Sequence, residues 1–280
     1  MLRALMFIAV GLSSLAIGEC ACAAEEYHPW ALFEVGSWKK VRVVTETLGV
    51  DGKVESVSTT DTRTTLTAFD DTSYSLKVEA TVEVAGRRFQ TEPKIVRQGF
   101  YGEQPGQASD LKVVGSGEVV VCGRRFPTQL QEVTVNNKDG NRITLLHFSK
   151  DTAPYVLKRE TRAVGDASGG PSAVECSVEV LAIDMPYKVL TEIKPAAFVR
   201  TIQMQKNAVA LSTIEVQCVD VPGAVVSHSS QEFDATGRLV RRSTLDLVDY
   251  DIARPVQTSV IPKKDEPRRR FFRHSRNRRQ

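Results

Sequence analysis

The feature that most constrains the fold is a strict alternation of apolar and polar side chains between Tyr74 and Val84. Every second residue in this segment is apolar, and the residues between them are serine, lysine, glutamate or threonine. Side chains of an extended strand point alternately to opposite faces of a sheet, whereas a helix would spread these apolar residues around its circumference. The pattern therefore predicts an antiparallel strand with one buried face.

The same alternation returns in residues 174–180 and 210–218, where it predicts that Cys176 and Cys218 point inward with the apolar side chains. No long segment shows a capped 3.6-residue period, so helix is expected only as a turn or two at residues 29–33 or 195–197. Turn-forming residues separate segments of strand length and predict hairpins. They are Asp51-Gly52, Ala85-Gly86, Cys122-Gly123, Asp139-Gly140, Ser168-Gly169-Gly170 and Thr236-Gly237.

These observations predict an all-β fold with minor helix, built as a large curved antiparallel sheet that forms an open or half-closed barrel. A two-sheet β-sandwich is the alternative. The long hairpins favour the single curved sheet, because sandwich strands are usually shorter and are joined across the two sheets.

Two internal similarities indicate a modular arrangement. Residues 84–91 recur as residues 121–128 with six of eight positions identical, which predicts two hairpins of one turn design. A looser similarity relates the stretch from Asp151 to Pro154 to the stretch from Asp220 to Pro222. In both, a strand ends, a proline interrupts ladder pairing and the next strand begins. The β domain then consists of two similar halves, unless the match is a chance similarity between β-sequences.

The first residues have the order of a secretory signal: Arg3, an apolar stretch, and small residues at 21–24. We expect a signal peptide at residues 1–24, an antiparallel β domain at 25–255 and a disordered basic tail at 256–280. The protein is therefore expected to be exported, periplasmic or secreted, with no transmembrane span after signal removal.

The basic tail differs in charge from the rest of the chain. Residues 263–280 carry a net charge of +7, although the whole chain carries only +3. Such a segment is expected to be disordered alone and to bind an anionic surface, either lipid or an acidic envelope polymer, into which its phenylalanines insert. A tail that only keeps the protein soluble is the alternative. Nucleic acid is not an expected partner of an exported protein. The candidate binding residues are Arg268, Arg269, Arg270, Phe271, Phe272, Arg273, Arg276, Arg278 and Arg279.

The sequence shows no catalytic constellation. Its histidines, His28, His147, His228 and His274, stand in no metal-binding or cofactor-binding motif, so we predict no catalytic, cofactor or metal residues. His228 lies between two serines, but in a strand it points away from both neighbours. An extracellular hydrolase remains an alternative if carboxylates such as those of Glu46, Asp61 and Glu160 meet in three dimensions.

Two further groups leave alternatives open. Arg87-Arg88 and Arg124-Arg125 occupy equivalent hairpins, and we interpret them as solvated charges that discourage edge-to-edge aggregation, with a basic rim as the alternative. Cys122, Cys176 and Cys218 follow the signal segment and allow at most one intramolecular disulfide, whose pairing the sequence does not reveal.

The signal peptide, the long hairpins and the strand-Asp-x-x-Pro-strand passage from Asp151 to Leu157 resemble bacterial periplasmic open-barrel proteins of the lipoprotein-carrier (LolA-like) type. This resemblance implies an apolar cavity, between a curved sheet and a lid, that holds acyl chains. The leading hypothesis is a non-catalytic secreted or periplasmic protein that binds a ligand or envelope partner through a curved β-surface. The hydrolase and a structural envelope component tethered by the basic tail are the alternatives, and the oligomeric state is open.

Overall fold

The computed structural model describes residues 28–254, except residues 71, 105–106, 108, 138–139, 164–173 and 206–207. Several predictions concern residues outside this described part of the chain. These are the signal peptide at 1–24, the basic tail at 256–280, His274, and the turn residues Asp139 and Ser168-Gly169-Gly170.

The described residues form strands joined by turns and loops. The strands are β1 (Trp38–Leu48), β2 (Val54–Phe69), β3 (Ser73–Val84), β4 (Arg87–Gln90), β5 (Lys94–Gly99), β6 (Ser109–Val121), β7 (Arg124–Asn137), β8 (Gly140–Phe148), β9 (Val156–Ala163), β10 (Val174–Val189), β11 (Glu192–Gln205), β12 (Ala208–Gln217), β13 (Val225–Phe233) and β14 (Leu239–Asp251).

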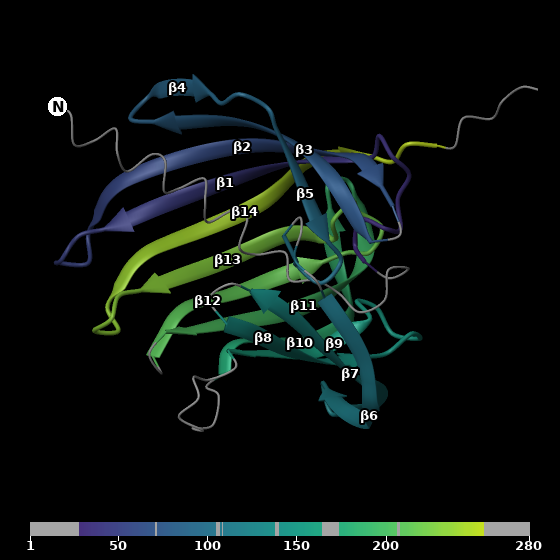
Figure 1. The fold of residues 1–280 in the computed structure, drawn as a ribbon. Coiled ribbons are helices and arrows are strands. Elements are labelled where there is room, and N and C mark those ends of the chain that lie inside the picture. The colour runs from purple at the N-terminus through teal and green to yellow at the C-terminus, as the bar shows by residue number, and fades with distance from the viewer. Residues whose placement is uncertain are drawn as a thin grey trace, which may run out of the picture.

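All fourteen strands belong to one antiparallel sheet, in which most neighbours in sequence are also neighbours in space. The order is β4-β3-β2-β1-β14-β13-β12-β11-β10-β9-β8-β7-β6, and β5 pairs with β3 beside β4. The sheet is strongly curved but not closed, because β4 and β5 form one edge and β6 forms the other (Figure 1). The predicted all-β fold with a large, curved, open antiparallel sheet is confirmed.

The small amount of predicted helix is not found in the described residues. Residues 28–33 form successive turns, with hydrogen bonds from the amide of Ala31 to the carbonyl of His28 and from Phe33 to Trp30. Residues 195–197 lie within β11, so the helix predicted there is wrong. Pro195 pairs with Pro186 beside two register shifts in β10, and prolines are tolerated in sheets at such irregular positions.

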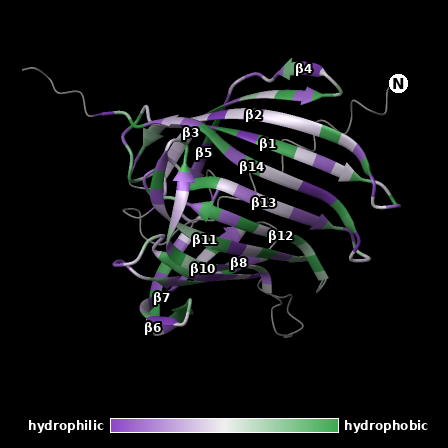
Figure 2. Cartoon of the chain, turned by 180° about the vertical axis from the view of Figure 1, so that it is seen from behind, coloured by the Kyte–Doolittle hydropathy of each residue, from purple (hydrophilic) through white to green (hydrophobic). Residues whose placement is uncertain are grey.

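The alternation between Tyr74 and Val84 forms β3, as predicted. Tyr74, Leu76, Ala80 and Val82 are buried, whereas the lysine and glutamates between them are not. Hydrophobic and hydrophilic residues also follow one another along other strands of the sheet, such as β1 (Figure 2). Burial of each large apolar side chain contributes about 1.5 to 3 kcal/mol, which fixes the register of the strand.

Register identifies the two faces of the sheet. Starting from the buried Val43 in β1, cross-strand partners lead through Leu245, His228 and Glu215 to Val199 in β11. We call this the inner face, because it carries the buried apolar residues of most strands. The outer face carries cross-strand ion pairs, such as those of Arg42 with Asp61 and Arg200 with Glu179, both at 2.7 Å.

The sheet curls inward at the β6 edge. Val121 and Phe126, beside the turn between β6 and β7, pack in one buried cluster with Val180 of β10 and Val199 of β11. The thiol of Cys122 in this turn lies 3.1 Å from the carbonyl oxygen of Leu181. Because β10 is four places from β6 in the strand order, this contact half-closes that side of the sheet.

Two pairs of connections share their geometry. The turns at 85–86 and 122–123 both have two residues with positive φ, which is the type I′ hairpin turn. The loops 149–155 and 218–224 also match: the amide of Ser149 bonds the carbonyl of Tyr155 at 2.7 Å, and that of Cys218 bonds Ala224 at 2.8 Å. These geometries agree with the sequence similarities. That the domain consists of two similar halves stays a prediction.

One end of the sheet is capped by residues 28–37 and the loop 218–224. Trp30 is fully buried among Leu66, Tyr74, Leu76 and Phe100. The amide of Gly223 donates a hydrogen bond to the carbonyl of Pro29 at 3.1 Å, and the ammonium of Lys39 donates one to the carbonyl of Gly223 at 3.2 Å. Gly223 therefore joins the loop to the N-terminal segment.

Replacing Gly223 by alanine should strongly weaken this cap. Gly223 has a φ of +69°, and an added Cβ would lie 2.8 Å from both the Lys39 nitrogen and Trp30. Left-handed backbone and overpacking together predict a loss of about 2 to 4 kcal/mol in the free energy of unfolding, measured with urea. Gly237→Ala is the matched control, because its φ is +82° but its Cβ would meet nothing within 4 Å. Equal losses in both variants would show that the crowding at Gly223 is unimportant.

Candidate functional site

The most unusual residue of the inner face is Arg159 in β9, which is only 4% exposed. Its cross-strand partners are Leu146 in β8 and Val178 in β10. Val178 lies two residues before the buried Val180, so register places Arg159 on the inner face. A charged side chain at such a position is rare, because its burial costs several kcal/mol without a compensating partner.

The Arg159 guanidinium is incompletely satisfied. Neither Nε nor Nη2 has a hydrogen-bond partner in the structure, although both are buried. Burial lowers the pKa of Arg159, whereas a hydrogen bond with Cys176 and the charge of Glu215 act in the opposite direction. An arginine stays protonated under these conditions, so the inner face holds a fixed positive charge with two free donors.

Polar side chains continue from Arg159 across the inner face. Register leads from Val178 through Thr201 and Thr213 to Ser230 in β13. The hydroxyl of Thr213 donates a hydrogen bond to that of Ser230 at 3.0 Å, and the amide of Gln217 donates one to the carboxylate of Glu215 at 3.0 Å. This polar row lines the face with hydroxyl groups that can donate or accept hydrogen bonds.

Toward β7, the cross-strand row that contains Arg159 includes a second side chain with an unpaired polar atom, Gln131. Leu146 separates Arg159 from Gln131 in β7, which is 4% exposed. Gln131 donates a hydrogen bond from Nε2 to Gln129 at 2.7 Å, but its Oε1 has no partner in the structure. Buried polar atoms are rarely left unpaired, so two such residues in one cross-strand row indicate a site that is polar for a reason other than stability.

Apolar clusters flank this polar row. Val133 and Leu146 pack with Phe148 and Val156 in one cluster, and Leu157 and Val180 belong to a second. The site therefore combines one buried cation, several neutral polar groups and extensive apolar surface. Such an arrangement can bind an anionic group through two parallel hydrogen bonds and an attached apolar group through burial.

We call Arg159, Gln131, Cys176, Thr213 and Glu215 the inner-face cluster. Sequence reasoning predicted the inward direction of Cys176 but missed the role of Arg159. The only signal in the sequence is that Arg159 follows Leu157 by two residues, the spacing that places both side chains on one face of a strand. In the structure both are buried, whereas Lys158 and Glu160 are only partly buried. This signal is weak, since residues 158–162 are all polar.

The carboxylates proposed for a hydrolase are not brought together. Glu46 pairs with Arg242, Asp61 with Arg42, and Glu160 with Lys158 and Arg162. They belong to β1, β2 and β9, and β9 is five or more places from the other two strands in the sheet order. Their cationic partners lower the pKa of Asp61 and of Glu160 below the usual carboxyl value. A lowered pKa makes Asp61 and Glu160 poor general acids, because a general acid needs a raised pKa.

The two basic pairs also stay apart. Arg87 and Arg88 lie in β4 at one edge of the sheet, whereas Arg124 and Arg125 lie in β7 beside the other edge (Figure 1). Arg88 lies 3.9 Å from the Asp61 carboxylate, and Arg125 pairs with Glu118 at 3.0 Å. These arginines do not form one basic rim, and their exposure agrees with a protective role at strand edges.

The described histidines and cysteines were also candidates for a site. His228 pairs with Leu245 on the inner face, whereas Ser227 pairs with Asp246 on the outer face, as the alternation predicts. Burial lowers the pKa of His228. Cys122, Cys176 and Cys218 are all free thiols, respectively exposed, partly buried and buried. Within the described part of the chain, no three His, Cys, Asp or Glu side chains form a group that could hold a metal ion.

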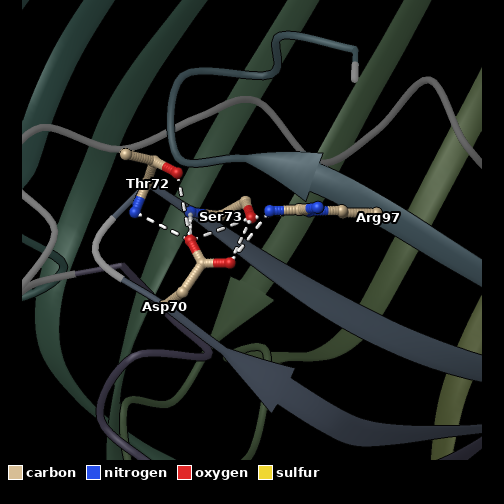
Figure 3. A network of polar contacts seen from close by, with 4 residues as sticks. All are labelled: Asp70, Thr72, Ser73 and Arg97. Atoms are coloured by element: carbon tan, nitrogen blue, oxygen red, sulfur yellow. Dashed lines mark hydrogen bonds and ion pairs between the residues drawn. The ribbon is translucent and has the colours of Figure 1, made fainter. Parts of the chain in front are cut away.

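A dense polar network at Asp70 has a structural explanation. Figure 3 shows its carboxylate accepting hydrogen bonds from the amides of Thr72 and Ser73, at 3.0 and 2.8 Å, and meeting Arg97 at 3.0 Å. The amide of Thr72 and the hydroxyl of Ser73 are the main causes that lower the Asp70 pKa to about 2. The network fixes the turn between β2 and β3 and ties it to β5, as aspartate commonly does in turns.

Comparisons with known proteins give no assignment. No protein-family model and no curated protein sequence matches the chain. Among solved structures, a protein described as a thioesterase II from Thermobifida fusca YX is 13% identical, with 77% of this chain and 79% of that chain covered and a TM-score of 0.14. An inactive mutant of the CurK dehydratase is 12% identical, with 84% and 85% covered and a TM-score of 0.13. Likenesses this low carry no argument about function.

Among the described residues, none forms a helix that is long and apolar enough to cross a membrane.

Proposed function

We propose that this chain is a non-catalytic, exported binding protein that holds an anionic ligand against the inner face of its curved sheet. The observation that carries the proposal is the buried Arg159, with two guanidinium nitrogens left without partners. A buried guanidinium with unpaired nitrogens is costly, and an anionic ligand would supply the missing hydrogen-bond acceptors.

The surroundings of Arg159 favour a ligand with an apolar part. Leu146, the cross-strand partner of Arg159, and Leu157, two residues before it, belong to two buried apolar clusters. A carboxylate or phosphate on an alkyl chain matches both properties. Lipid as a partner and export to the periplasm or exterior therefore remain parts of this proposal. The basic tail and its role in tethering stay predictions, because residues 256–280 lie outside the described part of the chain.

Binding of alkyl anions tests the proposal. Isothermal titration with dodecanoate and dodecyl phosphate should show binding, whereas dodecanol should bind much more weakly because it cannot pair with the guanidinium. Replacing Arg159 by methionine should weaken binding of the anions by about 10-fold to 150-fold, as expected for a charge-assisted hydrogen bond of about 1.5 to 3 kcal/mol. Native mass spectrometry of gently purified protein should also detect a bound ligand and report whether residues 1–24 have been removed.

Arg200→Met is the matched control. Arg200 lies on the outer face, where it pairs with Glu179 at 2.7 Å, so its loss should leave binding unchanged. The proposal fails if dodecanol binds as tightly as dodecanoate, or if the variants at positions 159 and 200 behave alike.

A further inference from the structure

The β6 edge of the sheet is unusually exposed. Among the described residues β6 pairs only with β7, so its other side presents backbone groups that no described strand pairs with. Residues 110–116 are all exposed, which means that side chains on both faces of this strand are open to water. Three of them are large and apolar: Leu111, Val113 and Val114, at 36%, 60% and 51% exposure. A long edge strand of this kind is a template for pairing with another strand.

The opposite edge is shorter and more basic, although Phe89 of β4 and Ile95 and Val96 of β5 are also exposed there. β4 has only four residues, Arg87 to Gln90, and begins with two arginines. β5 contributes Lys94 and Arg97 to the same edge. Short strands and basic side chains are common means of preventing edge pairing. An interaction through the sheet is therefore expected at β6 and not at β4 or β5.

β6 pairs with β7 in two regular parts, and the first of them is short and symmetric in charge. The register with β7 is continuous from Ser109 to Val113 and shifts between Val113 and Gly115. Leu111 is the centre of this regular part, and Asp110 and Lys112 flank it. These two charged residues pair with each other at 2.8 Å and are 57% and 64% exposed. The bulge limits any added strand to about five residues.

We propose that β6 pairs with β6 of a second copy of this chain, antiparallel and centred on Leu111. A two-fold axis at this residue places Asp110 of each copy opposite Lys112 of the other, and Leu111 opposite Leu111. Centring on either charged residue would instead oppose two like charges, which destabilises a strand pair. The partner is therefore specified by the sequence of the strand itself, and the interface is closed and isologous.

This dimer is weak. About five residues from each copy bury far less than the roughly 1,200 Å² of stable complexes, so the dissociation constant is expected at about 10⁻⁵ to 10⁻³ M. The inner-face cluster contains no residue of β6, although its Gln131 is the cross-strand partner of Val113, so the dimer is tested without ligand.

Sedimentation velocity over a range of protein concentrations tests the dimer through charge exchange. Asp110→Lys and Lys112→Asp should each weaken dimerisation at least about 10-fold, because like charges would then face each other twice. The double exchange Asp110→Lys with Lys112→Asp should restore it. Glu118→Lys is the control, since Glu118 is exposed in the same strand but lies beyond the bulge, and it should leave the dimer unchanged.

Circular dichroism confirms that each variant retains its sheet. The proposal is overturned by a protein that stays monomeric at millimolar concentration, by single exchanges without effect, or by a double exchange that fails to restore the dimer. Open-ended assemblies that grow with concentration would also overturn it, because they indicate pairing of β6 with the β4 and β5 edge of another copy.

Discussion

The Arg159→Met variant should be more stable than the unmodified protein when neither contains ligand, by about 1 to 4 kcal/mol in the free energy of unfolding. Methionine fills a similar volume but requires no hydrogen bonds, and it removes a charge whose Nε and Nη2 have no partner. Both proteins should be refolded from urea to remove ligand, and urea titrations followed by circular dichroism measure the difference.

This gain in stability separates a binding residue from a structural one. If Arg159 only holds the fold together, its replacement would leave Cys176 and Glu215 without their positive neighbour and would lower stability. A large loss would therefore contradict the proposed function. Arg200→Met should change stability by no more than about 0.5 kcal/mol, because surface substitutions usually have small effects. Stability gained together with ligand binding lost is the result that the structure predicts.

Acid should destabilise the protein through His28. The ring is 4% exposed and lies against Tyr74 and Phe100, with centroids at 4.5 and 5.6 Å. Burial lowers the pKa of His28 from 6.5 to about 3. The folded protein therefore keeps this imidazole neutral, whereas the unfolded chain takes up a proton below pH 6.5. The contribution of His28 is fully present above pH 6.5 and is lost as the pH falls toward 3.

The expected effect is large. One proton of difference changes the free energy of unfolding by about 1.4 kcal/mol per pH unit, which gives a loss of about 2 kcal/mol between pH 6.5 and 5. His28→Asn should flatten this dependence. Asparagine does not titrate, and its carbonyl can accept the hydrogen bond that Nδ1 now accepts from the amide of Trp30 at 3.3 Å. Urea titrations at pH 7, 6 and 5 measure both proteins.

The comparison between the two slopes is decisive, because other groups also titrate. Burial lowers the pKa of His147 and of His228 as well, so part of the pH dependence should persist in the His28→Asn variant. Most carboxylates stay ionised above pH 5 and contribute little in this range. Identical slopes for the variant and the unmodified protein would show that His28 is accessible to protons in the folded state. The variant should also be less stable at pH 7, since it loses the ring contacts.

Local patterns were sufficient for the secondary structure and for the direction of many side chains. The alternation from Tyr74 to Val84 predicted β3 and its buried face, and the same rule predicted that His228 points away from its neighbouring serines. Local patterns failed at residues 195–197, where a turn or two of helix was expected but the chain continues as β11, opposite an irregular part of β10. The bulges in the neighbouring β10 make Pro195 acceptable there, and they depend on pairing between strands.

The candidate site could not be predicted, because its residues are separated in sequence and are joined only by strand pairing. Gln131, Arg159 and Thr213 come from β7, β9 and β12, and each stands in a segment with ordinary strand composition. Conversely, Glu46, Asp61 and Glu160 looked like candidate acids, but the strand order separates Glu160 from the other two. Counting residue types could not distinguish these two sets.

The sequence by itself determined that this chain forms antiparallel strands with one apolar face, since side-chain direction follows from the two-residue period of extended backbone. Only the tertiary structure decided which strands are neighbours, how far the sheet curls, and that the curl buries Arg159 with two guanidinium nitrogens that have no hydrogen-bond partner. The physical reason is that the burial of a side chain and the pairing of its polar atoms depend on which distant segments pack around it. That packing is set only when the strands have paired.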